Sequence, residues 1–79
     1  MDFQTKIATL KQYESECYQV CYYLARNDKT ACKAAEEAMV TLFTSEDFWT
    51  ADELKRRKAV QRAAMGSCMK LLKHEEIAV

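Results

Sequence analysis

Hydrophobic residues recur at three- and four-residue steps along most of the chain, and this spacing predicts helices. The first run spans about residues 3–26. Asp2 precedes it as a candidate N-cap, because its carboxylate can accept from the first free backbone amides. Asn27 and Asp28 end it, since both tolerate turn geometry. The apolar face of this predicted helix consists of Phe3, Ile7, Leu10, Tyr13, Cys17, Val20, Cys21 and Leu24.

A second run spans about residues 31–43, with Thr30 or Asp28 as its cap. Its predicted buried stripe consists of Ala31, Ala34, Ala35, Ala38, Met39, Leu42 and Phe43. The small side chains in this stripe would let a neighbouring helix approach closely. Residues 44–49 read as a loop that ends in the aromatic pair Phe48 and Trp49, which we expect to close one end of a small core.

A third run spans about residues 51–74. The segment "TADE" before it fits a capping box, in which Thr50 and Glu53 bond each other's backbone amides. Gly66 lies inside this run and marks a close packing point, a bend or a binding surface, because glycine costs about 1 kcal/mol relative to alanine there. Its inner face consists of Leu54, Val60, Ala63, Ala64, Cys68, Leu71 and Leu72. We expect residues 75–79 to be frayed.

Composition supports an all-α fold. The chain has 79 residues, one glycine and no proline, so it lacks the residues that hairpins and tight turns need. We predict a single domain over residues 1–79, built as a compact three-helix bundle. No segment approaches the roughly 20 apolar residues of a membrane helix, and no signal peptide is evident. We therefore expect a cytoplasmic protein with reduced cysteines and no membrane contact.

Charge is distributed unevenly although the net charge is zero. Residues 1–49 carry five basic and eight acidic residues, whereas residues 50–73 carry seven basic and two acidic ones. The segment "KRRK" at residues 55–58 is a basic cluster that can meet phosphate or an acidic surface. Two different contact surfaces are therefore expected.

The residues that could carry chemistry do not form a recognisable catalytic or metal site. Cys17 and Cys21 share a helix face, but their spacing does not match structural zinc sites, so buried thiols are the simpler interpretation. His74 is the only histidine and has no evident catalytic partner. We expect a non-enzymatic protein without metal or cofactor. A thiol-based redox or metal sensor that uses Cys17, Cys21 and Cys32 is the least favoured alternative.

Two pairs of adjacent residues have a plain and a functional interpretation. Glu36 and Glu37 are either solvated carboxylates beside an apolar stripe or a docking face for a basic partner. Phe48 and Trp49 either close the core or present an aromatic edge that stacks on an unpaired base.

Three segments together resemble region 2 of the bacterial RNA polymerase sigma factors. They are "YESECYQVCYYLARND", "ACKAAEEAMVTLF" and "AVQRAAMGSCMKLLK", within about residues 13–73. The chain is most similar to a stand-alone region 2 that acts as co-regulator in a split sigma factor. The resemblance implies a transcription-initiation role in which this chain docks on core RNA polymerase, while a separate sigma subunit carries region 4.

The resemblance also implies roles for particular residues. On the second helix, Met39, Val40, Leu42 and Phe43 would hold the helix to its own core. Contact with the clamp helices of the largest polymerase subunit would come from Lys33, Glu36, Glu37 and Thr41. Contact with promoter DNA would come from Trp49, Lys55, Arg56, Arg57, Lys58 and Arg62.

Three departures from the family pattern limit what the resemblance implies. Lys33 stands where the family has Asp in the polymerase-binding helix, and Ala59 and Gly66 stand where the family has Trp and Asn in the last helix. The residues that help family members open and read DNA are thus largely missing, so the resemblance implies polymerase docking rather than independent promoter melting. The alternative is an unrelated small helical interaction module, either anti-sigma-like or a self-associating bundle.

Overall fold

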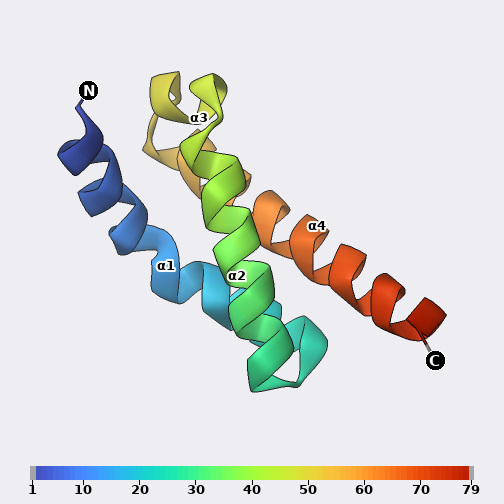
Figure 1. Ribbon diagram of the computed structural model, residues 1–79. Coiled ribbons are helices and arrows are strands. Elements are labelled where there is room, and N and C mark those ends of the chain that lie inside the picture. The colour runs from blue at the N-terminus through green and yellow to red at the C-terminus, as the bar shows by residue number, and fades with distance from the viewer. Residues whose placement is uncertain (1, 79) are drawn as a thin grey trace.

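The computed structural model describes residues 2–78, and side chains over residues 2–73. It contains four helices, which are α1 (Phe3–Ala25), α2 (Asp28–Phe43), α3 (Glu46–Thr50) and α4 (Glu53–Ala78) (Figure 1). Residues 2–78 contain no strand, so the predicted all-α class is confirmed. The prediction of three helices is wrong by one, because the expected loop contains the short helix α3.

The three long helices pack against one another in all three pairs. In Figure 1, α2 crosses in front of α1 and α4, and α3 lies at the end where α1 begins. The last turns of α4 project past the other helices. The molecule is accordingly elongated, with principal extents of 43 × 21 × 18 Å.

The ends of α1 are set by polar and backbone groups. The Asp2 carboxylate accepts a 2.8 Å hydrogen bond from the Thr5 amide, which confirms the predicted N-cap. At the other end Arg26 adopts a left-handed backbone with φ of 56°. Its amide donates to the Tyr22 carbonyl over 2.7 Å, which satisfies one of the last free carbonyls of α1.

The start of α2 differs from the prediction. Its cap is Asn27, whose side-chain oxygen accepts a 3.2 Å hydrogen bond from the Thr30 amide. Asp28 is instead the first helical residue, where its negative charge lies at the positive end of the helix dipole. Thr30 is buried inside the first turn, so neither Thr30 nor Asp28 is the N-cap that the sequence predicted. The helix therefore begins about one turn earlier than the apolar stripe suggested.

The predicted capping box at the start of the last helix is wrong. Thr50 belongs to α3, and its hydroxyl donates to the Asp47 carbonyl over 3.2 Å. Asp52 caps α4 instead, because its carboxylate accepts a 2.9 Å hydrogen bond from the Lys55 amide. The helix continues to Ala78 rather than ending near residue 74. The predicted fraying of residues 75–79 is therefore wrong for residues 75–78, which are helical, and residue 79 lies outside the described residues.

The core is built from small side chains and sulfur rather than from large aliphatic groups. The buried hydrophobic residues are Leu10, Tyr13, Cys17, Cys21, Ala31, Ala34, Ala35, Ala38, Leu42, Phe48, Val60, Ala64 and Cys68. The alanines of α2 allow both α1 and α4 to pack closely on it. All of the predicted alanine stripe is therefore confirmed.

Some predicted inner positions are exposed. Phe3 and Leu54 are each 65% exposed, and Leu24 is also on the surface. All three lie in the first or last turn of a long helix, where little of a neighbouring helix covers them. Phe3 keeps only an edge-to-face contact with Phe43, at 5.6 Å between ring centroids. Within the described residues, no helix combines the length and apolarity needed to cross a lipid bilayer.

Candidate docking surface on α1 and α2

The face of α2 opposite its buried alanines forms an exposed stripe. Three- and four-residue steps place five residues on it, namely Lys33, Glu36, Glu37, Val40 and Thr41. We call these five residues the α2 stripe. All four residues that the resemblance assigned to polymerase contact belong to it. These four residues therefore share one surface, as expected for residues three and four positions apart on a helix.

Val40 lies in the α2 stripe and is 64% exposed. The prediction that it holds α2 to the core is wrong. Residue 40 is two positions from both Ala38 and Leu42, and two helical steps turn a side chain by about 200°. Leu42 is buried, and Met39 and Phe43 pack partly against the core, as predicted. The α2 stripe thus contains an exposed apolar side chain among charged ones.

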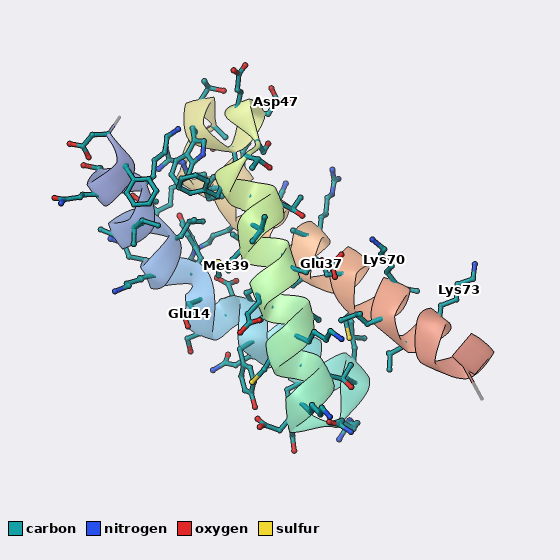
Figure 2. The ribbon with its side chains drawn as sticks, in the orientation of Figure 1. Glu14, Glu37, Met39, Asp47, Lys70 and Lys73 are labelled. Atoms are coloured by element: carbon teal, nitrogen blue, oxygen red, sulfur yellow. The ribbon has the colours of Figure 1, made fainter. Side chains whose placement is uncertain are left out.

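The adjacent carboxylates of Glu36 and Glu37 lie in different environments. Glu37 faces α4, where its Oε1 lies 3.3 Å from the Nζ atom of Lys70 (Figure 2). Glu36 faces away from Lys70 and lines the groove between α1 and α2. Consecutive helix positions diverge by about 100°, so one partner group cannot easily engage both carboxylates. Glu36 is exposed and is therefore accessible to a partner.

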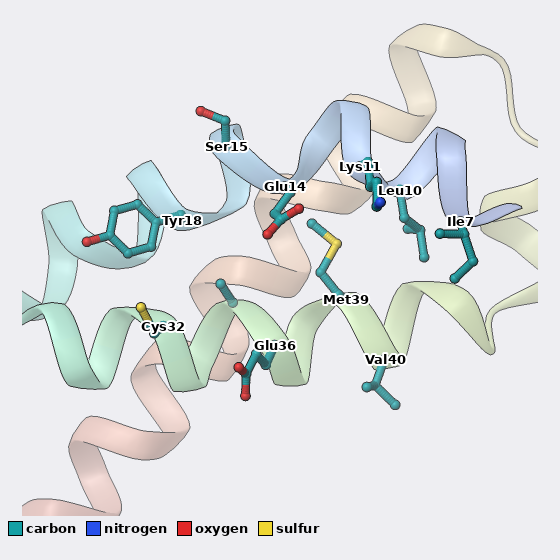
Figure 3. A pocket seen from close by; sticks show the side chains of 11 residues that line it. Ile7, Leu10, Lys11, Glu14, Ser15, Tyr18, Cys32, Glu36, Met39 and Val40 are labelled. Atoms are coloured by element: carbon teal, nitrogen blue, oxygen red, sulfur yellow. The ribbon is translucent and has the colours of Figure 1, made fainter.

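An open groove of about 860 Å³ runs between α1 and α2 (Figure 3). It is lined by Ile7, Leu10, Lys11, Glu14, Ser15, Tyr18, Cys32, Ala35, Glu36, Met39 and Val40. Figure 3 shows Met39 reaching from α2 toward α1, whereas Val40 projects from the opposite edge of α2. Charged side chains therefore share the lining of the groove with apolar ones. This composition suits an amphipathic helix laid along the groove.

One end of the groove is fixed by a hydrogen bond between elements. The Tyr18 hydroxyl on α1 donates to the Asp28 carboxylate at the start of α2. This bond raises the pKa of Tyr18 to about 12, mainly because the phenol must give up its donation to a carboxylate when it ionises. Tyr18 therefore stays protonated at neutral pH and ties the two walls of the groove together.

The predicted DNA contacts separate into groups. Lys55, Lys58 and Arg62 lie with the hydroxyl residues Thr41 and Ser45 along a second, smaller groove of about 390 Å³ between α2 and α4. Arg57 is exposed but does not line that groove. The four cations of "KRRK" therefore have different environments. Lys55 and Lys58 line the smaller groove, Arg57 lies outside it, and Arg56 is bonded within the chain.

Arg56 is engaged inside the chain. Its Nε donates to the Phe48 carbonyl over 3.2 Å, and its Nη2 donates to the Trp49 carbonyl over 3.0 Å. The guanidinium also lies over both rings, 5.7 Å from the Phe48 centroid and 5.9 Å from the Trp49 centroid. Arg56 therefore caps the end of α3. Its position in "KRRK" gave no signal that distinguishes it from its neighbours.

Trp49 and Phe48 close the core, which confirms the favoured interpretation of this pair. Phe48 is 2% exposed and Trp49 packs partly against the core. The Trp49 indole donates to the Phe43 carbonyl over 2.8 Å. The Lys6 ammonium lies 5.3 Å from the Trp49 ring centroid. Stacking of Trp49 on a base stays a prediction, with the ring already flanked by two cations of this chain.

Cysteine sulfur lines the interface between helices. Cys17, Cys21 and Cys68 are buried, whereas Cys32 is exposed, so the prediction of buried thiols is confirmed for three of the four. Burial, with a smaller effect of Cys21, raises the pKa of Cys17 to about 12, and burial also raises that of Cys21. Both thiols are therefore protonated and unreactive at neutral pH.

The residues whose side chains are described contain no group of three or more His, Cys, Asp or Glu residues that could hold a metal ion. Cys17, Cys21 and Cys32 do not come together as the sensor alternative requires, because two are buried in the core and Cys32 faces the groove. The His74 side chain lies outside the described residues.

Sequence reasoning missed the α1 wall of the groove. Lys11, Glu14 and Tyr18 follow three- and four-residue steps beside the buried stripe of α1, so periodicity could have placed them on one face. Nothing in their own pattern indicates that α2 lies across from them.

Comparison of the chain with known protein families, with curated proteins and with solved structures gives no match.

Proposed function

We propose that this protein is a non-catalytic co-regulator of transcription initiation that docks on core RNA polymerase through the α2 stripe and the adjoining groove. In this proposal the chain supplies a module that resembles sigma region 2, and a separate sigma subunit supplies region 4. The observation that carries the proposal is the grouping of Lys33, Glu36, Glu37 and Thr41 around the exposed Val40.

Charge and shape support this choice of partner. The clamp helices of the largest polymerase subunit form an arginine-rich coiled coil in the family that the sequence resembles. Glu36 and Glu14 place carboxylates beside the apolar lining of the groove, where an approaching guanidinium could bond them. Val40 and Met39 supply apolar area, and such buried contacts give a docking surface most of its affinity.

Promoter DNA would then meet the basic start of α4. Lys55, Lys58 and Arg62 are exposed and share one groove, so phosphates could contact them together. Arg57 could add a further contact from its own side of the helix. We leave Arg56 out of this set, because its donors are already bonded to the α3 carbonyls.

Co-purification with core polymerase tests the docking surface. We expect Glu36→Lys combined with Val40→Asp to reduce recovery of the large polymerase subunits by about tenfold, as loss of a central contact does at protein interfaces. Glu46→Lys on α3 is the matched charge reversal outside the surface and should leave recovery unchanged. Full recovery with the double variant would refute the proposed docking surface.

Glu37 requires a separate variant because of its partner Lys70. Glu37→Lys alone removes both the internal pair and any external contact. The exchange Glu37→Lys with Lys70→Glu restores the internal pair with reversed polarity. If Glu37 contacts polymerase, the exchange will remain defective, whereas a purely internal role predicts recovery of binding.

The alternative is an unrelated helical interaction module. The mixed composition of the groove fits this alternative as well as it fits polymerase docking. A groove with apolar lining and both charges at its rim accepts any complementary amphipathic helix. A second copy of the chain would be one such partner. Sedimentation of the purified chain separates the two, because a stable dimer that forms without polymerase supports the alternative.

A further inference from the structure

Neither the backbone conformation nor the packing of the chain requires glycine at position 66. It lies in the interior of α4 with an ordinary negative φ, so no left-handed backbone requires glycine there. It is exposed, and a Cβ built on it would meet no atom within 4 Å. Glycine in a helix interior lowers stability relative to alanine. The remaining physical reason for glycine is close approach by another molecule's backbone.

The residues around Gly66 occupy helix positions that can receive a side chain from another helix. Arg62, Met65, Gly66 and Met69 occupy positions i, i+3, i+4 and i+7, which is the diamond that receives one knob in helix packing. Met65 is 46% exposed and Met69 is 61% exposed, although both side chains are apolar. Flexible thioethers adapt well to a docking partner. We call these four residues the Gly66 socket.

The charge around the Gly66 socket is positive. Residues 54–73 contain no acidic residue. Lys58 lies one turn before the socket, and Lys73 lies one turn beyond it and projects outward from α4 (Figure 2). Two carboxylates on neighbouring helices already have partners on α4, because Glu37 pairs with Lys70 and Glu16 accepts from Gln61 over 3.3 Å. The complementary surface is therefore apolar in its centre and acidic at its edges.

We propose that the exposed face of α4 binds an acidic amphipathic helix of another protein, which inserts an apolar side chain into the Gly66 socket and places carboxylates against Lys58, Arg62 and Lys73. Phosphate groups would satisfy the cations but would leave Met65 and Met69 uncovered. A second copy of α4 would bring like charges together. An acidic helix satisfies both the apolar and the charged groups of this face.

This site is separate from the proposed polymerase surface. No residue of the Gly66 socket lines the groove between α1 and α2 or belongs to the α2 stripe. The α4 face shares Lys58 and Arg62 with the proposed contact to promoter DNA, so an acidic helix and DNA phosphates would compete for these two cations. The inference goes beyond the proposed function and does not depend on it. Variants at Val40 report on one site and variants at Gly66 report on the other.

Fluorescence anisotropy with a labelled synthetic helix tests the proposal. The probe peptide carries leucine at its a and d positions and glutamate on both flanks, and a control peptide carries lysine in place of glutamate. We expect the intact chain to bind the acidic peptide and not the basic one. Gly66→Leu should weaken binding by roughly tenfold or more because it fills the socket.

The same experiment distinguishes apolar docking from charge attraction alone. Met65→Gln with Met69→Gln leaves the charge unchanged, and we expect it also to weaken binding roughly tenfold. Tyr23→Gln is the control that removes an exposed aromatic side chain of α1 outside both proposed surfaces, and it should bind normally. Circular dichroism will show that each variant is folded, and Gly66→Leu is expected to melt at a higher temperature than the intact chain.

Three outcomes would overturn the proposal. Acidic-peptide binding that survives both the Gly66 and the methionine variants would reduce it to nonspecific charge attraction. Methionine-dependent binding of a duplex oligonucleotide without peptide binding would assign this face to DNA. Self-association that Gly66→Leu abolishes would identify the occupant as a second copy of this chain.

Discussion

Single cysteines in this fold differ sharply in environment although all four belong to helices. Cys32 is exposed in the groove, whereas Cys17, Cys21 and Cys68 are buried. We predict that a maleimide labels only Cys32 in the native chain, because the other three thiols are buried and inaccessible to the reagent. Intact-mass spectrometry counts the labels.

Two controls define this labelling experiment. Cys32→Ser should remove native labelling, and denaturant should expose all four cysteines of the intact chain. Rapid addition of a second label to the native chain would contradict the burial of the three core thiols.

At the level of single elements, α2 depends on one side chain for its start. Asn27→Ala removes the oxygen that accepts from the Thr30 amide. Loss of such a cap lowers the free energy of unfolding by about 0.5–2 kcal/mol. Urea denaturation measures the change.

Asn27→Asp keeps an acceptor at the same position and is the matched control. We expect it to retain most of the stability, since Asp is as good an N-cap as Asn. Equal losses in the Ala and Asp variants would show that another feature of the turn, and not the cap, determines the start of α2.

The long helices could be predicted from sequence, but their ends and α3 could not. Three or more turns of regular spacing give a strong periodic signal, and α1, α2 and α4 have it. α3 has five residues, too few for a repeat to appear. Thr50 and Asp52 are both good acceptors two positions apart, so sequence could not decide which of them caps α4.

For the whole molecule, packing depends on how little space the alanines of α2 occupy. Ala38 is fully buried where α2 meets its neighbours. We predict that Ala38→Leu lowers the free energy of unfolding by about 1–3 kcal/mol, because the added atoms force helices apart. Thermal unfolding followed by circular dichroism measures the loss.

Ala8→Leu is the matched control on the exposed side of α1. Leucine and alanine are both good helix formers, so this variant should change stability little. A similar loss at both positions would argue against tight packing at α2.

The candidate site was only partly predictable from sequence, because some of its contacts join residues that are far apart in the chain. The α2 stripe follows from the alanine stripe, because a helix that buries one face exposes the other. The groove and the ion pair between Glu37 and Lys70 join residues that are far apart in sequence. Arg56 looked like its basic neighbours until the position of α3 was known. The local sequence pattern shows which face of a helix is buried. Which helix packs against that face is known only from the tertiary fold.

Trp49 makes intrinsic fluorescence a local probe of this molecule. It is the only tryptophan, and its indole is bonded to the Phe43 carbonyl at the α3 end. Emission will therefore follow the α2–α3 corner, while far-ultraviolet dichroism averages over every helix. Coincident transitions from the two signals would indicate a single cooperative unit. An earlier dichroism transition would show that helix outside the α2–α3 corner melts first, as expected for the projecting turns of α4.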